Sequence, residues 1–322
     1  MTSSSESLVL DTYALRPQPS WPVRYRRALW RFITTKPLGA FGGAIVILFL
    51  IMAFAPFLFT TQDPNPNPPP ILERLQGPSS AHWFGTDQYG RDVYTRIIYG
   101  ARTSIIIGFL VVFISASLAS IIGTVSGYFG GWFDTIAQRI VDIGIALPGL
   151  IFIILVVTTL TNFPPSFIAD PLHLDPSARV VFRIAFALGV LISLGSSRII
   201  RGAAISAKQN VYVEAARVVG ATDSRIIVRH IFPNVFAVVL VSASIQIGSA
   251  ILIESSLSFL GYGVQPPTPS WGRMLSEARE SLVRHPHLAI FPGIAIYLAV
   301  FSFNMLGDAL RDVLDPRLRG SR

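Results

Sequence analysis

The sequence predicts an all-α membrane protein with six transmembrane helices. Of its 322 residues, 51% are hydrophobic and only 14% are charged, whereas a soluble domain carries roughly 25% charged residues. The apolar residues also lie in long uncharged runs, such as 38–60 and 103–132. A helix needs about 18 or more such residues to cross the roughly 30 Å of hydrocarbon in a bilayer. Several runs of this length in one chain argue against a large soluble protein with buried helices.

Six spans can be drawn from these runs. The first follows a polar tail, 1–37, and lies too far from the start of the chain for a cleavable signal peptide, so we expect it to remain as an anchor. The fourth is the weakest, because only residues 184–197 separate Arg183 from Arg198; it can span if the two arginines reach opposite interfaces. We place the six spans at 38–60, 103–127, 142–163, 181–200, 234–257 and 288–307.

The net charge of +8 indicates orientation rather than nucleic-acid binding, because no basic run is interleaved with aromatic residues. An even number of spans puts both termini on one side. If that side is the cytoplasm, the cytoplasmic segments hold most of the 26 Lys and Arg residues, as the positive-inside rule requires. We therefore expect a multi-pass protein of the plasma (inner) membrane, surrounded by lipid, with both termini cytoplasmic and no nucleic-acid partner.

This orientation divides the chain into one membrane domain and two tails. The predicted parts are a cytoplasmic tail 1–37, a transmembrane domain 38–310 and a cytoplasmic tail 311–322, with outer loops 61–102 and 261–287 and a cytoplasmic loop 198–233.

The cytoplasmic loop 198–233 contains a short amphipathic helix. Asn210, Glu214 and Arg217 share one polar stripe of this helix. The opposite face is broad and apolar, and it consists of Val211, Tyr212, Ala215, Ala216 and Val219. Such a face suits docking into a groove of a partner, although packing against the chain's own bundle explains the pattern equally well.

The end of this helix is marked by Gly220, since glycine adopts the left-handed conformation that a turn needs. Residues 221–223 then offer a cap for a second helix, 224–231. We expect Pro233 to separate that second helix from the fifth span.

The loop also matches a known signature. Glu214-Ala215-Ala216, followed by Gly220 and then by Phe232-Pro233, resembles the EAA loop of ATP-binding-cassette importer permeases. His230 and Phe232 depart from the general pattern, but an Arg-His pair before the hydrophobic–Pro pair is usual in the peptide-permease branch. The resemblance implies a coupling helix that docks on an ATPase subunit. The residues that it assigns to this role are Tyr212, Glu214, Ala215, Ala216, Gly220, Ala221 and Pro233.

Further motifs, in the right order, resemble the dipeptide and oligopeptide branch of the same family. They are HWFGTD at 82–87, GRDV at 90–93, GARTS at 100–104, LSFLGYG at 257–263, PSWG at 269–272, NMLGDALRD at 304–312 and LDPR at 314–317. Only residues 1–20 and the loop 161–180 have no counterpart. On these motifs the chain is identified as a member of the dipeptide, oligopeptide and nickel importer family, as the second, C-type permease.

Membership implies a fold of the type I importer-permease kind, with six transmembrane helices and a cytoplasmic coupling helix. It implies that the chain forms half of a translocation pathway for dipeptides or oligopeptides, or for nickel or another solute, and works by alternating access. The partners that it implies are a second homologous permease in a heterodimer, two ATP-binding-cassette ATPase subunits and an extracytoplasmic peptide-binding protein.

The sequence contains no recognisable motif for ATP binding, catalysis or metal binding. A phosphate-binding Walker A loop needs a lysine directly after a glycine, and neither of the only lysines, Lys36 and Lys208, has one before it. The chain has no cysteine, and His285-Pro286-His287 lacks the nearby carboxylates that a metal site needs. We therefore expect no enzyme activity, no catalytic residue, no metal and no cofactor on this chain, with ATP and Mg²⁺ bound by the partner subunits.

Polar groups in a span are the remaining functional candidates. Glu254 and Gln246, both in the fifth span, are assigned to the translocation path, where Glu254 would meet the amino terminus of a peptide. Alternatively, Glu254 reaches the outer interface or pairs with an arginine of the neighbouring permease. An ion-driven carrier would show charged, broken helices and inverted repeats, and neither is visible. An intramembrane enzyme lacks a nucleophile–base or metal constellation here.

Overall fold

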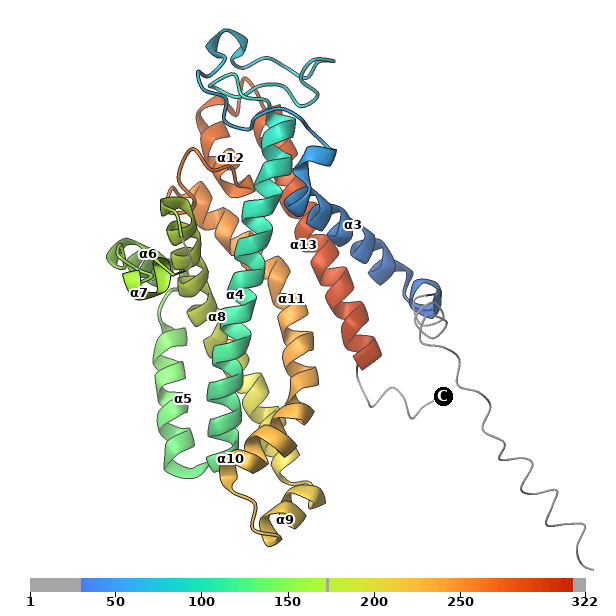
Figure 1. Ribbon diagram of the computed structural model, residues 1–322, viewed down its shortest axis with the longest axis vertical. Coiled ribbons are helices and arrows are strands. Elements are labelled where there is room, and N and C mark those ends of the chain that lie inside the picture. Colours follow the sequence, from blue (N-terminus) through green and yellow to red (C-terminus); the bar gives the residue numbers. More distant parts are fainter. Residues whose placement is uncertain (1–29, 172–173, 315–322) are drawn as a thin grey trace, which may run out of the picture.

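The computed structural model describes residues 30–171 and 174–314, and helices are the only extended regular elements among them (Figure 1). The predicted tails 1–37 and 311–322 lie largely outside the described residues. Among these residues five helices are long and apolar enough to cross a membrane. They are α3 (Pro37–Phe54), α4 (Val93–Phe129), α8 (Pro176–Lys208), the helix that joins α10 (Asp223–Ile226) to α11 (Phe232–Phe259), and α13 (His287–Leu314). The predicted all-α membrane fold is confirmed.

The third predicted span, 142–163, is not a continuous helix. Two helices take its place, α5 (Gly131–Ala146) and α6 (Gly149–Thr159), and they meet at an angle of 93°. Leu147 between them is extended, with φ −73° and ψ 135°, because a residue that precedes proline is pushed out of the helical region. Pro148 also lacks the N–H that would continue the helix. A sixth span therefore exists only if this bent pair is counted as one.

The other spans differ from their predicted ranges at the ends. α3 stops at Phe54 instead of reaching Thr60, since Ala55 precedes Pro56 and leaves the helical region. α4 and α8 begin earlier than predicted, because each has an aspartate at its N-cap. The carboxylate of Asp92 accepts a hydrogen bond from the Thr95 amide at 2.8 Å, and Asp175 caps α8 in the same way.

Small residues set the packing of the helices. α4 runs almost the whole length of the molecule with α8 beside it (Figure 1). A Cβ atom at Gly123 of α4 would lie 2.5 Å from the carbonyl oxygen of Ser197, and one at Gly42 of α3 would lie 2.7 Å from that of Ser302. Only glycine lets two helix backbones approach this closely. Close approach increases the van der Waals packing that holds helices together in a bilayer.

The connections gather at the two ends of this bundle. The α12 end holds the segment 55–92 and the short helix α12 (Trp271–Ala278), and the α9 end, opposite to it, holds the short helix α9 (Val211–Val218) together with α10 (Figure 1). Lys36, just before α3, forms an ion pair with Asp312 near the end of α13. The first and last membrane helices therefore begin and end on the same side, as an even number of spans requires.

We expect Gly123→Ala to lower the stability of the isolated chain by about 1–3 kcal/mol, the usual effect of forcing extra volume into a packed site. Gly202→Ala on α8 is the matched control, since a Cβ at Gly202 meets no atom within 4 Å; it should be neutral or stabilise by up to about 1 kcal/mol. Thermal unfolding in detergent measures both variants, and equal melting temperatures for the two would contradict this account of the packing.

Candidate functional site

α9 is closed at its C-terminal end by a compact turn built from three of the residues of the predicted coupling loop. Gly220 has a φ of +83°, as predicted. Its amide donates to the carbonyl of Arg217 at 3.0 Å, and the amide of Ala221 donates to the carbonyl of Ala216, also at 3.0 Å. This pair of bonds is a Schellman motif, which satisfies the last carbonyls of a helix. Ala216, Gly220 and Ala221 therefore have a local structural reason for their positions.

One side of α9 packs on the bundle. Val213 is only 1% exposed, and the half-buried Ala216 and Ala221 lie with it against a cluster that includes Ile226 and Val235. The predicted apolar face was therefore wrong in part, because it included Ala216 and omitted Val213. Alanine is small enough at positions 216 and 221 to bring the helix close to its neighbours.

The other side of α9 is apolar and has no cover in the described chain. Val211 is 80% exposed, and Val218 and Val219 are each 87% exposed. The remaining exposed residues on this side are Tyr212, Glu214 and Ala215. We name these six residues the α9 face: Val211, Tyr212, Glu214, Ala215, Val218 and Val219. Exposed apolar residues gathered on one short helix indicate a site of protein–protein contact.

After α9 the chain does not follow the predicted order. Thr222 takes the predicted cap position, but its side chain makes no capping hydrogen bond. Pro233 does not separate α10 from the fifth span, since the helix runs on from Asp223 to Phe259. A π-helical turn, Ile227–Ile231, precedes Phe232 and adjusts the backbone around the N–H that Pro233 lacks. The side chain of Asn234 donates to the carbonyl of His230 at 2.6 Å, which helps to satisfy the backbone at this point.

The two candidates for the path both lie on α11. Glu254 is 0% exposed, and its carboxylate accepts a hydrogen bond from the hydroxyl of Ser258 at 2.6 Å. Gln246 joins three helices: its side-chain oxygen accepts from Ser115 of α4 at 3.1 Å, and its nitrogen donates to Ser196 of α8 at 3.0 Å. Neither residue lines the cavities at the α12 end of the described chain, and a role in the path stays a prediction for both.

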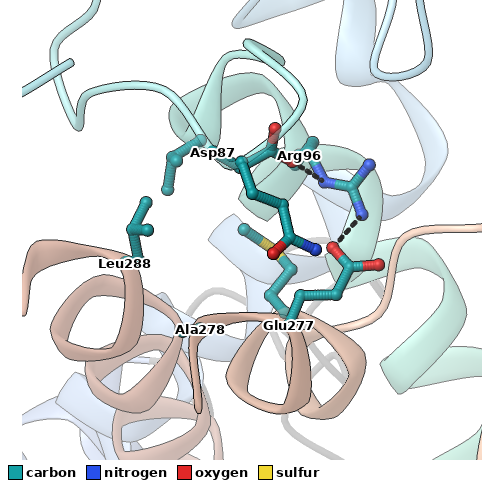
Figure 2. Close-up of a pocket in the computed structure, with 8 residues that line it drawn as sticks. Asp87, Arg96, Glu277, Ala278 and Leu288 are labelled. Carbon is teal, nitrogen blue, oxygen red and sulfur yellow. Dashed lines mark hydrogen bonds and ion pairs between the residues drawn. The ribbon is translucent and has the colours of Figure 1, made fainter. Parts of the chain in front are cut away.

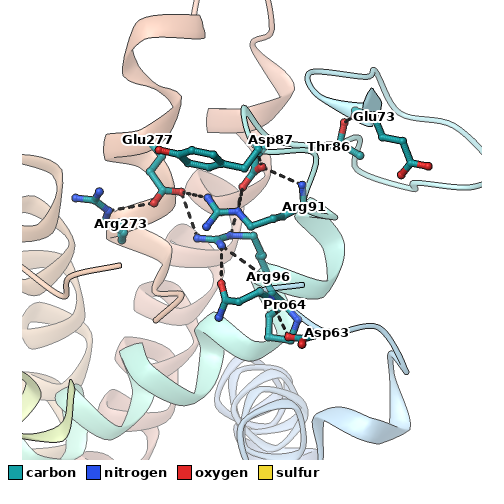
Figure 3. Close-up of polar contacts among 11 residues, drawn as sticks. Asp63, Pro64, Glu73, Thr86, Asp87, Arg91, Arg96, Arg273 and Glu277 are labelled. Atoms are coloured by element: carbon teal, nitrogen blue, oxygen red, sulfur yellow. Dashed lines mark hydrogen bonds and ion pairs between the residues drawn. The ribbon is translucent and has the colours of Figure 1, made fainter. Parts of the chain in front are cut away.

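A buried cluster of charges, missed in the sequence, joins α12 to the start of α4 (Figure 3). Glu277 of α12 accepts hydrogen bonds from three guanidinium groups. They are those of Arg91 at 2.9 Å, Arg96 at 3.2 Å and Arg273 at 3.1 Å. Asp87 adds a bond from the Nε of Arg91 at 2.7 Å. Arg96 is 1% exposed, and buried charges of this kind persist only when they are paired.

A buried aromatic side chain also fills this joint, the contact between α12 and the start of α4. The indole of Trp271, which is fully buried, donates to the carbonyl of Ile97 at 2.9 Å. A Cβ at Gly100 would lie 3.2 Å from its ring. Motifs that are far apart in the sequence, 82–104 and 269–277, thus form one structural unit. In the sequence, the only signal for this unit was the pair Arg91 and Arg96, which lie five residues apart ahead of an uncharged run.

This joint has no room for a peptide. The cavity beside Arg96 and Glu277, near Leu288 of α13, measures about 20 Å³ (Figure 2), whereas ligand pockets measure roughly 300–1,000 Å³. Within 30–171 and 174–314, no three His, Cys, Asp or Glu side chains are arranged so that they could hold a metal ion. The Glu277 cluster is therefore a structural contact. A separate, open cavity of about 310 Å³ lies at the same end, with Trp83, Tyr94 and Thr95 among its lining residues. The exposed α9 face is the feature suited to contact with a partner.

Comparison with known proteins gives a family. Residues 119–320 match the family described as "Binding-protein-dependent transport system inner membrane component". The chain is 40% identical over 296 residues to the glutathione transport system permease protein GsiD of Pectobacterium atrosepticum, covering 91% of each chain. It is 38% identical over 294 residues to the dipeptide transport system permease protein DppC of Alkalihalophilus pseudofirmus, covering 91% of this chain and 90% of the relative.

Glu277→Ala should destabilise the chain by about 3–5 kcal/mol, because it leaves three guanidinium groups without their shared carboxylate in a buried site. Glu280→Ala, three residues further on at an exposed position, is the control and should have almost no effect. Thermal unfolding gives the loss, and hydrogen exchange of the α12 amides shows whether the joint opens. Unchanged exchange in Glu277→Ala would rule out its role in holding α12.

Proposed function

The chain belongs to the family of binding-protein-dependent transport system inner membrane components, and on this basis we propose that it is the importer subunit through which short peptides cross the membrane. It is a multi-pass membrane permease of an ATP-binding-cassette importer, not the subunit that hydrolyses ATP. The relatives named above are permeases for glutathione and for dipeptides. Both cargoes are short peptides, and we assign that class to this chain.

The observation that carries the coupling part of this proposal is the exposed α9 face. Burying the side chains of Val211, Val218 and Val219 would contribute roughly 1.5 kcal/mol or more of favourable free energy each, which is absent while they lie in water. A partner with an apolar groove would recover it. We assign this partner to the ATPase subunit, which places the α9 end, and with it both termini, in the cytoplasm.

The construction of α9 supports its use as a lever. Val213 and Ala216 hold one side of the helix on the bundle, and the turn at Gly220 closes its end. A helix held in this way moves as one body when a partner pushes on it. In the proposed cycle, ATP binding closes the two ATPase subunits, α9 moves with them, and the bundle opens outward to accept a peptide. Hydrolysis then resets the bundle.

The remaining partners are those that membership of the importer family implies. The α12 end faces the extracytoplasmic side, where a peptide-binding protein delivers the cargo. A second, homologous permease supplies the other half of the pathway in a heterodimer. ATP and Mg²⁺ are bound by the ATPase subunits.

Within this chain we assign Gln246 and Glu254 to the path. Gln246 sits between α4, α8 and α11, so any separation of α11 from the other two helices exposes its amide to the cargo. Glu254 lies two helical turns further along α11, toward the α12 end. Unchanged uptake of peptide by a Glu254→Gln variant would contradict its assignment.

The cargo class is tested with the complex purified together with its partners and reconstituted in vesicles. On addition of ATP, we expect uptake of radiolabelled glutathione or L-alanyl-L-alanine, and competition by unlabelled short peptides. Free alanine should not compete, since it lacks a peptide bond and its amino and carboxylate groups are closer together than the two ends of a dipeptide. Uptake of ⁶³Ni²⁺ without uptake of either peptide would overturn the peptide assignment and leave the importer assignment standing.

Val218→Asp should remove the ATPase subunits from the complex, because a charge in an apolar groove leaves an unpaired, desolvated carboxylate. The fold should not change, since Val218 is 87% exposed. Val283→Asp is the matched control at the α12 end, where Val283 is 95% exposed, and it should keep the ATPase subunits. Affinity purification of each tagged variant measures this, and full retention of the ATPases by Val218→Asp would exclude α9 as their docking site.

A further inference from the structure

The last turn of α4 lies directly against the segment that carries α9. Tyr128, the next-to-last residue of α4, is 3% exposed. Its ring belongs to the same buried cluster as Val213 of α9 and Ile226 of α10. Tyr128 thus lies in the buried cluster against which α9 packs.

Two polar contacts of Tyr128 hold the chain on either side of α9. Before α9, the ammonium group of Lys208 donates to the carbonyl of Tyr128 at 2.6 Å and lies 5.4 Å from the centre of its ring. After α9, the hydroxyl of Tyr128 donates to the carboxylate of Asp223 at 2.5 Å. Lys208 is the last residue of α8, and Asp223 is the first residue of α10. Both ends of the α9 segment are therefore fixed to one residue.

The residues beside Tyr128 tie the same turn to the rest of the bundle. Ser126 donates to Asp134 of α5, and Asp134 accepts a bond from the Nε of Arg201 of α8 at 2.6 Å. A Cβ at Gly127 would lie 2.8 Å from the carbonyl oxygen of Arg201. The end of α4 is thus in close contact with α5 and α8, with no space in which it could shift alone.

The covalent route from α9 to α11 is less regular. Beyond α10 the chain passes through the π-helical turn Ile227–Ile231 before α11 begins. A π-turn departs from the regular hydrogen bonding of a helix, and such turns mark places where helices adjust. The bond between Tyr128 and Asp223 bypasses this turn, because it joins the start of α10 directly to α4.

We propose that Tyr128 is the positioning residue that passes the movement of α9 to α4, and that its hydrogen bond to Asp223 is the contact that does so. This inference rests on the proposed function, since it requires that α9 be moved by an ATPase. Without the bond, α9 still docks and ATP is still hydrolysed, but less of the movement of α9 in each ATP cycle reaches the membrane helices. Transport per ATP falls, while assembly does not.

The test uses the complex with both permeases, the ATPases and the binding protein in vesicles. ATP hydrolysis and uptake of radiolabelled glutathione and L-alanyl-L-alanine are measured in the same sample. Tyr128→Phe removes only the hydroxyl and keeps the ring and the carbonyl that binds Lys208. We expect ATP hydrolysis within twofold of wild type and uptake per ATP lowered by about fivefold, the factor that corresponds to about 1 kcal/mol.

Three variants separate this role from a general loss of stability. Asp223→Asn keeps an oxygen that accepts the bond and should retain most of the uptake per ATP. Tyr94→Phe makes the same chemical change near the other end of α4, where the hydroxyl makes only a contact of 3.4 Å, and should match wild type. Tyr128→Phe combined with Asp223→Ala should lose no more than Tyr128→Phe alone, as for two groups that share one bond.

The outcomes are distinct. A wild-type ratio of uptake to ATP in Tyr128→Phe would overturn the inference and leave the proposed function intact. If Tyr128→Phe did not assemble, Asp223→Ala would decide the matter, since Asp223 is exposed and its loss removes the same bond; a wild-type ratio there would equally overturn the inference. No ATP-driven uptake of either peptide by the wild-type complex would overturn the proposed function itself.

Discussion

Along α4 and α8, glycines bring two long helices into backbone contact, and the other helices are arranged around this pair. A Cβ at Gly123 or Gly127 of α4 would strike a carbonyl oxygen of α8, and one at Gly189 of α8 would lie 3.1 Å from that of Val111. Lipid tails are as apolar as the helices, so close packing, not the hydrophobic effect, holds such helices together. The pair reaches from the Glu277 cluster to α9 and forms a stiff connection between the two ends.

The two ends of that connection are built in opposite ways. At the α12 end, polar groups are paired within the chain: Glu277 holds three arginines, and Trp271 fills the space between α12 and α4. At the α9 end, the buried side of the helix is packed, but the α9 face is exposed. The proposed cycle needs both features, since a force applied at one end acts at the other only if the connection between them does not give way.

Much of the fold and of the candidate site could be predicted because the signals were local. Uncharged runs located the spans, and Gly220 marked the end of α9 through its own backbone conformation. The break at Leu147–Pro148 was also local but was hidden within an apolar run. The helix through Pro233 and the burial of Val213 could not be predicted, because the π-turn and the neighbouring helices decide them. The Glu277 cluster joins residues that are about 180 positions apart in the chain, a pairing that no single motif contains.

The central claim is that this chain works only as part of an ATP-driven importer, with α9 as its contact with the ATPase subunits. The most direct measurement is native mass spectrometry of the tagged chain purified in mild detergent from its own membrane. The account predicts one assembly that contains this chain, a second and different permease, and two ATPase subunits. A chain that emerged alone, or paired only with copies of itself, would contradict the account.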